Sequence, residues 1–358
     1  MTDISNKRLV LHTGLPKTGT TSIQNTFFRC RKFLLRHHGT LYPELNENMT
    51  TPLATIFQEN PADHITNKMN GIKGHEEIQK LQKQYLDAVE QEFAQKNWST
   101  LIISAEGLSN HSADSLKSLL DWITSYVARW KVMIVIREPI SYTGSVIQQH
   151  LKGGETLEEL FTSPPLPSFR GRISNAMKAF GSGNLDVYRF EDAVSTSIGV
   201  VGTFAKHAGL PDSAISHLNE AAVVQNESLS LKAALILDSL NRHRPFFKNG
   251  ERSKQRHGRE LIYLEQIKGQ KFDIPLEVKD RIAQACGDDI EWLHQTRKIE
   301  PYQSSSLASE SSWDDAEQHS KIAHWAEELG ELMFSPDQEE LGARFVQKVS
   351  TDSLLSDN

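Results

Sequence analysis

A glycine-bounded loop near the start of the chain limits the possible folds more than any other segment. The apolar run Leu9–Leu11 predicts a strand, the loop reads Gly14-Leu-Pro-Lys-Thr-Gly-Thr-Thr21, and a helical pattern covers residues 20–37. In a strand–loop–helix of this kind, the backbone amides of the loop and of the first helical turn point to one position, where an anion binds. The segment therefore predicts a phosphate-binding loop in an α/β fold.

The loop differs from the nucleotide P-loop in the position of its lysine. The nucleotide pattern is Gly, four residues, Gly, Lys and then Ser or Thr, whose hydroxyl binds magnesium. Here Thr20 stands in the lysine position, and Lys17 lies three residues earlier, between the two glycines. A lysine at this place suits a nucleotide cofactor that has a short 5′ chain and a phosphate as its leaving group. A degenerate P-loop or a plain Gly/Thr-rich turn is the alternative interpretation.

A second phosphate-binding element is predicted about 120 residues later. The apolar run 131–136 predicts a strand that is buried on both faces, and Pro139 then opens a helix. Arg137 follows the strand, and Ser145 comes eight residues later on the helix. A guanidinium at the end of a strand and a hydroxyl on the next helix can converge on one phosphate. The alternatives are a structural ion pair for Arg137 and a solvent-exposed position for Ser145.

A candidate general base follows a third strand. Residues 98–104 predict that strand, and Glu106 lies just after its carboxyl end, at the edge where open α/β sheets bind ligands. Transfer of a group to an alcohol needs a base that takes the hydroxyl proton, and a carboxylate can serve. Alternatively, Glu106 caps the helix that starts near Asp114, or it pairs with Lys17.

These motifs resemble the sulfotransferase family whose donor is 3′-phosphoadenosine 5′-phosphosulfate. The segment 14–24 is similar to the 5′-phosphosulfate-binding loop of that family, and Arg137 with Ser145 is similar to its 3′-phosphate-binding element. In the heparan-type, carbohydrate-directed branch a glutamate after the corresponding strand is the base. The resemblance implies that Glu106 is the base and that Lys17 stabilises charge on the bridging oxygen. It also implies a set of ligands for the 5′-phosphate, namely Lys17, Thr18, Gly19, Thr20 and Thr21.

The implied in-line displacement at sulfur needs no metal, and the sequence predicts none. Cys30 and Cys286 are far apart, and neither Cys-x-x-Cys nor His-x-x-x-His spacing occurs. His12 on the first strand and His150 on the helix of Ser145 are second-rank candidates for the base.

The charge of the chain is unevenly distributed. Residues 301–358 carry twelve acidic and three basic side chains, whereas the whole chain has a net charge of −7. An acidic tail argues against nucleic-acid binding there and predicts a solvated helix with a frayed end. The stretch 248–259 contains five cationic residues, and it predicts either a solvated loop or a lid over a 3′-phosphate or an acidic acceptor.

The pattern predicts a short strand over residues 39–42 that Pro43 ends, a mixed insertion over 44–74 and a helix over 114–129. Strands that alternate with helices predict a three-layer α/β/α fold of the P-loop type. We expect a central, mainly parallel five-stranded sheet in a donor-binding domain over residues 1–300, and a helical extension over 301–358. No apolar run is long enough to span a membrane, no signal sequence is evident, and cysteines are few, so we expect a cytoplasmic, bacterial enzyme.

Three function classes remain open. The first is a sulfotransferase acting on a glycan or another small-molecule hydroxyl, with a lean toward carbohydrate that comes from the family resemblance alone. The second, a P-loop kinase, is disfavoured because no lysine follows Gly19. The third is a nucleotide-binding module without catalysis. The oligomeric state is not predicted.

Overall fold

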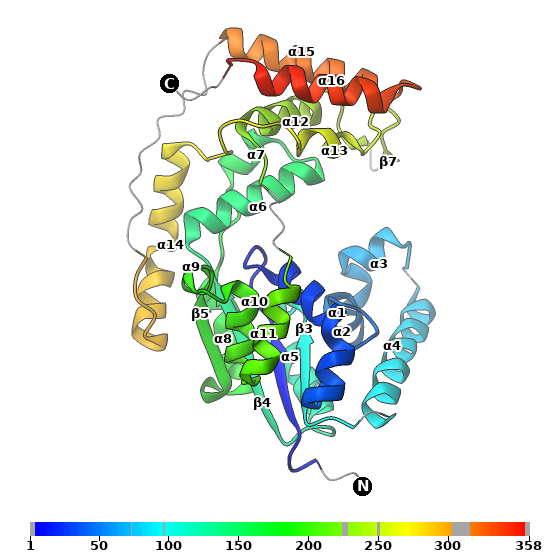
Figure 1. Cartoon of the computed structure of the whole chain (residues 1–358), viewed down its shortest axis with the longest axis vertical. Coiled ribbons are helices and arrows are strands. Elements are labelled where there is room, and N and C mark those ends of the chain that lie inside the picture. Colours follow the sequence, from blue (N-terminus) through cyan, green and yellow to red (C-terminus); the bar gives the residue numbers. More distant parts are fainter. Residues whose placement is uncertain are drawn as a thin grey trace. The chain divides into compact units, whose positions relative to one another are not determined.

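The computed structural model describes residues 4–72, 74–95, 97–223, 228–248, 251–302 and 316–354. These residues belong to two compact units, and Figure 1 labels most of their helices and strands. The sheet unit comprises Met1–Glu138, Ser168–Gln225 and Asp288–Tyr302. The helical unit comprises Pro139–Pro167, Asn226–Gly287 and Gln303–Asn358.

Within the described residues, the sheet unit is built on a five-stranded sheet in which all neighbouring strands are parallel. The order is β2-β3-β1-β4-β5, so β1 lies between β3 and β4. The strands are β1 (Arg8–His12), β2 (Thr40–Leu41), β3 (Thr100–Ser104), β4 (Arg129–Ile136) and β5 (Leu185–Arg189). Because β3 and the second half of β4 are buried on both faces, they read as continuous apolar runs. The predicted α/β class with a parallel sheet is confirmed.

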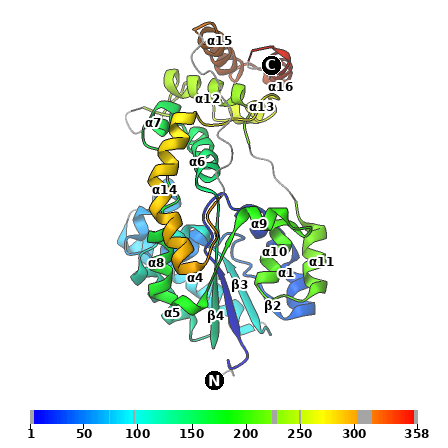
Figure 2. The same cartoon turned by 90° about the vertical axis from the view of Figure 1, so that its left-hand side faces the viewer.

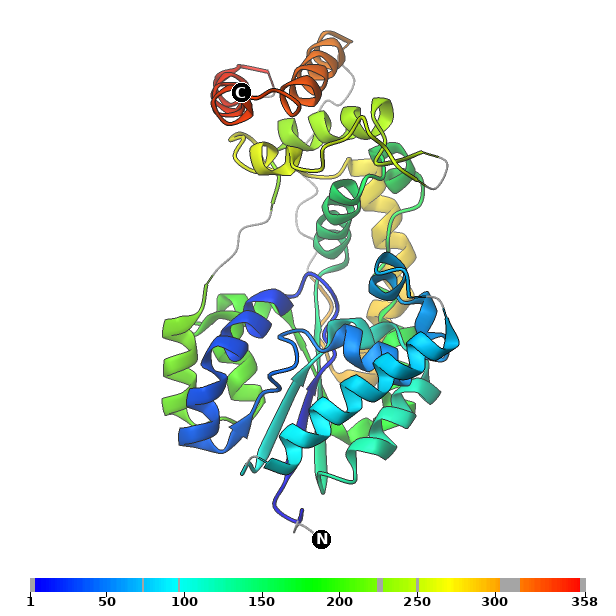
Figure 3. The same ribbon diagram turned by 90° about the vertical axis from the view of Figure 1, so that its right-hand side faces the viewer.

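Helices cover both faces of this sheet, as Figures 2 and 3 show. One face carries α1 (Thr20–His38), α10 (Gly199–His207) and α11 (Asp212–Ala221); the other carries α4 (His75–Gln95), α5 (Ala113–Ile123) and α8 (Phe169–Phe180). Under α1, the ring of Phe27 packs edge-on against Phe204 of α10, with centroids 5.2 Å apart. Both rings belong to a buried cluster that includes Val10. The three-layer arrangement follows from this burial of apolar helix faces.

The predicted insertion at 44–74 is mostly helical and is fastened to the segment after β3. It contains α2 (Thr50–Phe57), η1 (Pro61–Asp63) and α3 (Ile65–Met69), and η2 (Glu106–Asn110) follows β3. The amide of Met49 donates to the carbonyl of Ser104 (2.8 Å), and the amide of Gly107 donates to Oγ1 of Thr50 (3.1 Å). These bonds fix the backbone of the segment that carries Glu106.

The helical unit groups the acidic tail with earlier helices. Its elements are α6 (Pro139–Gly153), α7 (Leu157–Thr162), α12 (Leu231–His243), the hairpin β6 (Phe247–Lys248) and β7 (Glu251–Arg252), α13 (Glu260–Leu264), α15 (Ala316–Leu332) and α16 (Gln338–Thr351). Helix α15 packs on α12, and α16 packs on α13 and α15. Nζ of the buried Lys232 on α12 donates to the carbonyls of Val349 (3.3 Å) and Asp352 at the end of α16. The predicted domain boundary at residue 300 stays a prediction.

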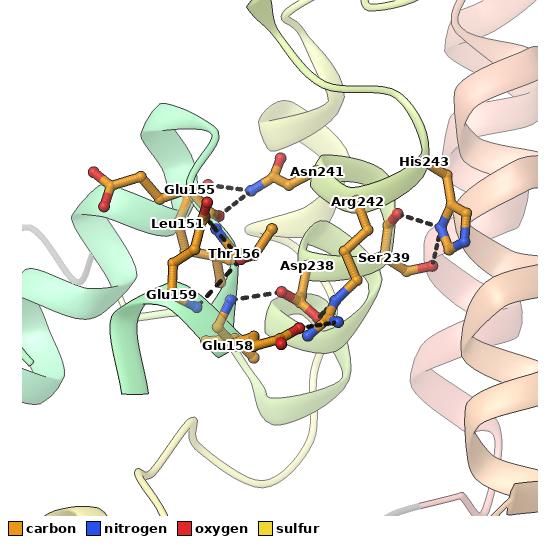
Figure 4. Close-up of polar contacts among 11 residues, drawn as sticks. Leu151, Glu155, Thr156, Glu158, Glu159, Asp238, Ser239, Asn241, Arg242 and His243 are labelled. Atoms are coloured by element: carbon orange, nitrogen blue, oxygen red, sulfur yellow. Dashed lines mark hydrogen bonds and ion pairs between the residues drawn. The ribbon is translucent and has the colours of Figure 1, made fainter. Parts of the chain in front are cut away.

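Buried polar contacts attach α12 to the connection between α6 and α7 (Figure 4). Nδ2 of Asn241 donates to the carbonyls of Leu151 (2.8 Å) and Glu155 (2.7 Å). Oδ1 of Asp238 accepts a hydrogen bond from the amide of Leu157 (2.6 Å), at the start of α7. These contacts satisfy backbone groups that the helix ends leave open.

One residue of the basic stretch 248–259 fits neither the solvated loop nor the lid that the sequence predicts. Arg256 is buried, and its guanidinium forms an ion pair with Glu260 (3.1 Å) and donates to Oδ1 of Asn241 (3.0 Å). Burial lowers the pKa of Arg256, and Glu260 opposes that shift. Arg256 is therefore a structural cation. Lys254 and Arg259 are exposed, and a lid role for them stays a prediction.

The last helix before β4 is shorter than predicted. The pattern predicted a helix over 114–129, but α5 ends at Ile123, and β4 begins at Arg129. Arg129 pairs in register with Arg8 of β1. Because β4 begins with polar residues, a prediction based on apolar runs does not detect this pairing.

Candidate functional site

The glycine-bounded loop connects β1 to α1 and leaves the start of that helix open to an anion. Gly19 is the N-cap residue of α1, so no side chain caps the first turn, and that turn holds no acidic residue. Uncapped amides and the helix dipole favour a negative group at this position. The loop therefore fits the phosphate that its sequence predicts.

Two left-handed residues shape the loop. Gly19 has φ 78° and Lys17 has φ 65°. A Cβ built at Gly19 would lie 2.7 Å from Cγ1 of Val200 and 3.3 Å from Cε2 of Phe190, so only glycine fits there. Lys17 holds its conformation without that freedom, at a cost of about 1–2 kcal/mol for a residue with a Cβ.

Hydroxyl groups of the loop have separate partners. Oγ1 of Thr18 is buried and donates to the carbonyl of Leu15 (2.6 Å), which closes the loop on itself. Oγ1 of Thr20 donates to the carboxylate of Glu106. Thr21 is exposed on the first turn of α1. Of the predicted phosphate ligands, Thr18 thus uses its hydroxyl proton within the loop.

The structure brings Glu106 to the loop and excludes one of its alternative roles. Glu106 is half-buried and begins η2, directly after β3, and its backbone carbonyl accepts a hydrogen bond from Oγ of Ser109 (2.9 Å). The N-cap residue of α5 is Ser112, whose Oγ accepts from the amide of Ser115 (3.2 Å). Glu106 is therefore not the cap of that helix.

Arg137 also contacts the loop. Its Nη1 donates to the carbonyl of Lys17 (2.8 Å), and its guanidinium lies 5.1 Å from the ring centroid of Phe190. Burial lowers the pKa of Arg137, while Glu191 and Glu138 oppose this shift, and a guanidinium remains charged at neutral pH. The first and second predicted phosphate elements are thus joined by a direct hydrogen bond.

Ser145 does not belong to the same compact unit as Arg137. It is half-buried on α6, which belongs to the helical unit, whereas Arg137 belongs to the sheet unit. Convergence of the two on one phosphate stays a prediction. On the same helix as Ser145, Nδ1 of His150 lies 2.8 Å from Oε1 of Glu155.

His12 lies beneath the loop in a buried network that the sequence did not reveal. Its Nδ1 is 2.9 Å from Oγ of Ser104, which also accepts a hydrogen bond from Nε2 of Gln24 (3.1 Å). Burial lowers the pKa of His12 to about 3, so the ring is neutral at pH 7. Because His12 has no solvent exposure, it is less suited than Glu106 to take a proton from an acceptor. The sequence signal that could have indicated this network was Gln24, a polar residue on the buried face of α1.

Neither a metal-binding cluster nor a membrane-spanning helix occurs among the described residues. No group of three or more His, Cys, Asp or Glu side chains there has the geometry to hold a metal ion. Among the same residues, no helix is both long and apolar enough to cross a membrane.

Comparisons with known proteins were made for the sequence and the structure. No family model matches the chain, and no curated protein is similar to it in sequence. The structure is similar to a sulfotransferase from Alicyclobacillus acidocaldarius, with 15% identity and a TM-score of 0.35, covering 61% of this chain and 86% of the other. It is also similar to the sulfotransferase domain from the curacin biosynthetic pathway, with 13% identity and a TM-score of 0.34, covering 90% and 98%. At such identities and scores, neither similarity assigns a role to a residue.

Proposed function

We propose that this chain is a sulfotransferase, which transfers the sulfuryl group of 3′-phosphoadenosine 5′-phosphosulfate to an acceptor hydroxyl. The observation that carries the proposal is that the loop of residues 14–21 is hydrogen-bonded to both of the other predicted elements, Arg137 and Glu106. Arg137 donates to the carbonyl of Lys17, and Thr20 donates to the carboxylate of Glu106. Lys17 itself lies between the two glycines of the loop, where the resemblance to the family requires a cation.

In the proposed reaction each group has a separate task. Glu106 takes the proton of the acceptor hydroxyl while the acceptor oxygen forms a bond to sulfur. The bond between sulfur and the oxygen of the 5′-phosphate breaks, and its electron pair leaves with adenosine 3′,5′-bisphosphate. Lys17 stabilises the charge that develops on the leaving oxygen, and the loop amides hold the 5′-phosphate. Arg137 is proposed to bind the 3′-phosphate, and Ser145 keeps its predicted part in that contact from the family resemblance.

The acceptor is proposed to be a carbohydrate hydroxyl, and the location cytoplasmic. Both statements come from the sequence resemblance and composition. The order of Glu106 after one strand and Arg137 after the next supports the heparan-type branch, whose acceptors are sugars.

A nucleotide titration with a transfer assay tests the proposal. Adenosine 3′,5′-bisphosphate is expected to raise the melting temperature in the absence of magnesium. Transfer of labelled sulfate from the donor to one member of a panel of glycans, phenols and lipids is then expected to identify the acceptor class. Stabilisation by ATP that depends on magnesium, with none by the bisphosphate, would instead support a kinase.

A further inference from the structure

The hydroxyl of Thr20 has one proton, and in this structure that proton goes to the carboxylate of Glu106. An ionised carboxylate only accepts hydrogen bonds, so the direction of this bond is fixed. Thr20 is also the first residue of α1, at the helix start that fits an anion, and it is only 3% exposed. With so little contact with water, a change of partner at Thr20 is an exchange between groups of the site.

A phosphate oxygen is likewise an acceptor without a proton to give. One hydroxyl proton forms a full hydrogen bond with only one acceptor at a time. A phosphate that draws the proton of Thr20 therefore takes it from Glu106. Hydrogen bonds to charged groups are among the stronger ones in proteins, so this exchange has a measurable free energy.

The backbone of Glu106 does not depend on this bond. Oγ of Ser109 donates to the Glu106 carbonyl (2.9 Å), and the amide of Gly107 donates to Oγ1 of Thr50 (3.1 Å). Loss of the contact with Thr20 therefore frees the carboxylate without releasing the segment that carries it.

We propose that Thr20 couples donor binding to the release of the general base. Without the donor, the Thr20 hydroxyl holds the Glu106 carboxylate against the loop. When the 5′-phosphate binds, the hydroxyl proton turns to a phosphate oxygen, and the carboxylate becomes free to accept the proton of the acceptor hydroxyl. The inference rests on the proposed function and adds an order to it, because the base is available only after the donor has bound.

A double-mutant cycle measures this coupling directly. Calorimetry gives the affinity for adenosine 3′,5′-bisphosphate of the parent protein, Glu106→Ala, Thr20→Val and the double variant. Glu106→Ala removes the competing acceptor and is expected to tighten binding. Part of that gain comes from removing a negative charge near an anion, and this part remains in the Thr20→Val background. We expect the gain to be about tenfold larger in the parent than in the Thr20→Val background, which lacks the hydroxyl, or about 1.4 kcal/mol of coupling.

A matched variant guards against a purely steric effect. Thr20→Ser keeps the hydroxyl and loses only a methyl group, so Glu106→Ala is expected to tighten binding in this background as it does in the parent. Equal gains in the parent and Thr20→Val backgrounds would mean that the carboxylate acts by charge alone, and the proposal would be wrong. If the parent protein does not bind the bisphosphate at all, the proposed function fails first, and this inference fails with it.

Discussion

The left-handed backbone of Lys17 allows its conformational role to be separated from its chemical role. At φ 65° a residue with a Cβ is strained, whereas glycine is not. The strain is worth about 1–2 kcal/mol, and the greater freedom of glycine in the unfolded chain offsets about 0.4–1 kcal/mol of it. Lys17→Gly is therefore expected to have a free energy of unfolding about 1 kcal/mol larger than Lys17→Ala. Urea unfolding followed by tryptophan fluorescence measures the difference.

Comparing two variants that both lack the ammonium group removes the charge from the comparison. Both are expected to lose sulfuryl transfer, so the more stable Gly variant remains inactive. Lys298, at φ 57° and exposed just after α14 (Leu276–Arg297), provides a matched control in the same unit. Its Gly and Ala variants are expected to differ in stability by a similar amount and to keep bisphosphate binding. Equal stability of Lys17→Gly and Lys17→Ala would refute the left-handed assignment, and transfer by Lys17→Gly would refute the role of the ammonium group.

Three further predictions concern the buried pair, the loop glycine and pH. Arg256→Met is expected to lower the free energy of unfolding by about 3–5 kcal/mol because it leaves the charge of the buried Glu260 unpaired, and Arg256→Met with Glu260→Gln, which keeps an oxygen for the amides of His257 and Gly258, is expected to recover part of this loss in urea unfolding. Gly19→Ala is expected to weaken bisphosphate binding about tenfold in calorimetry, with partial recovery when Val200→Ala removes the 2.7 Å clash; unchanged affinity in Gly19→Ala would contradict the loop geometry. His12 has a folded pKa of about 3, below its unfolded value of 6.5, so its contribution to stability is present above pH 6.5 and is lost as the pH falls toward 3. The loss from this residue is about 1 kcal/mol between pH 7 and 5.5, and urea midpoints for His12→Asn are expected to fall less over that range than those of the parent.

Local patterns predicted most of the sheet unit. The buried runs of β1, β3 and β4 and the helix predicted over residues 20–37 were visible because apolar periodicity and glycine or proline breaks mark such elements. The short strand β2 was also predicted, because Pro43 ends the strand-like run of residues 39–42. Prediction was weaker at the polar start of β4, where pairing with β1 decides the structure.

Contacts between distant residues explain what the sequence did not reveal. The bond from Thr20 to Glu106 joins residues 86 positions apart, and that from Arg137 to the Lys17 carbonyl joins residues 120 apart. The motifs predicted that these groups share a site, but not which atoms meet. The burial of Arg256 depends on Asn241 and Glu260, and a run of cations gives no sign of such partners. The helical unit is likewise assembled from three separate stretches of chain.

The central claim is that the site binds a nucleotide with a phosphate on each side of the ribose. A comparison of two nucleotides tests this claim most directly. Calorimetry without magnesium compares adenosine 3′,5′-bisphosphate with adenosine 5′-monophosphate, which lacks the 3′-phosphate. The bisphosphate is expected to bind at least about tenfold more tightly, since a charge-assisted contact with Arg137 is worth about 1.5–3 kcal/mol, and Arg137→Ala is expected to remove most of that preference. Equal affinity for the two nucleotides in the parent protein would contradict the account.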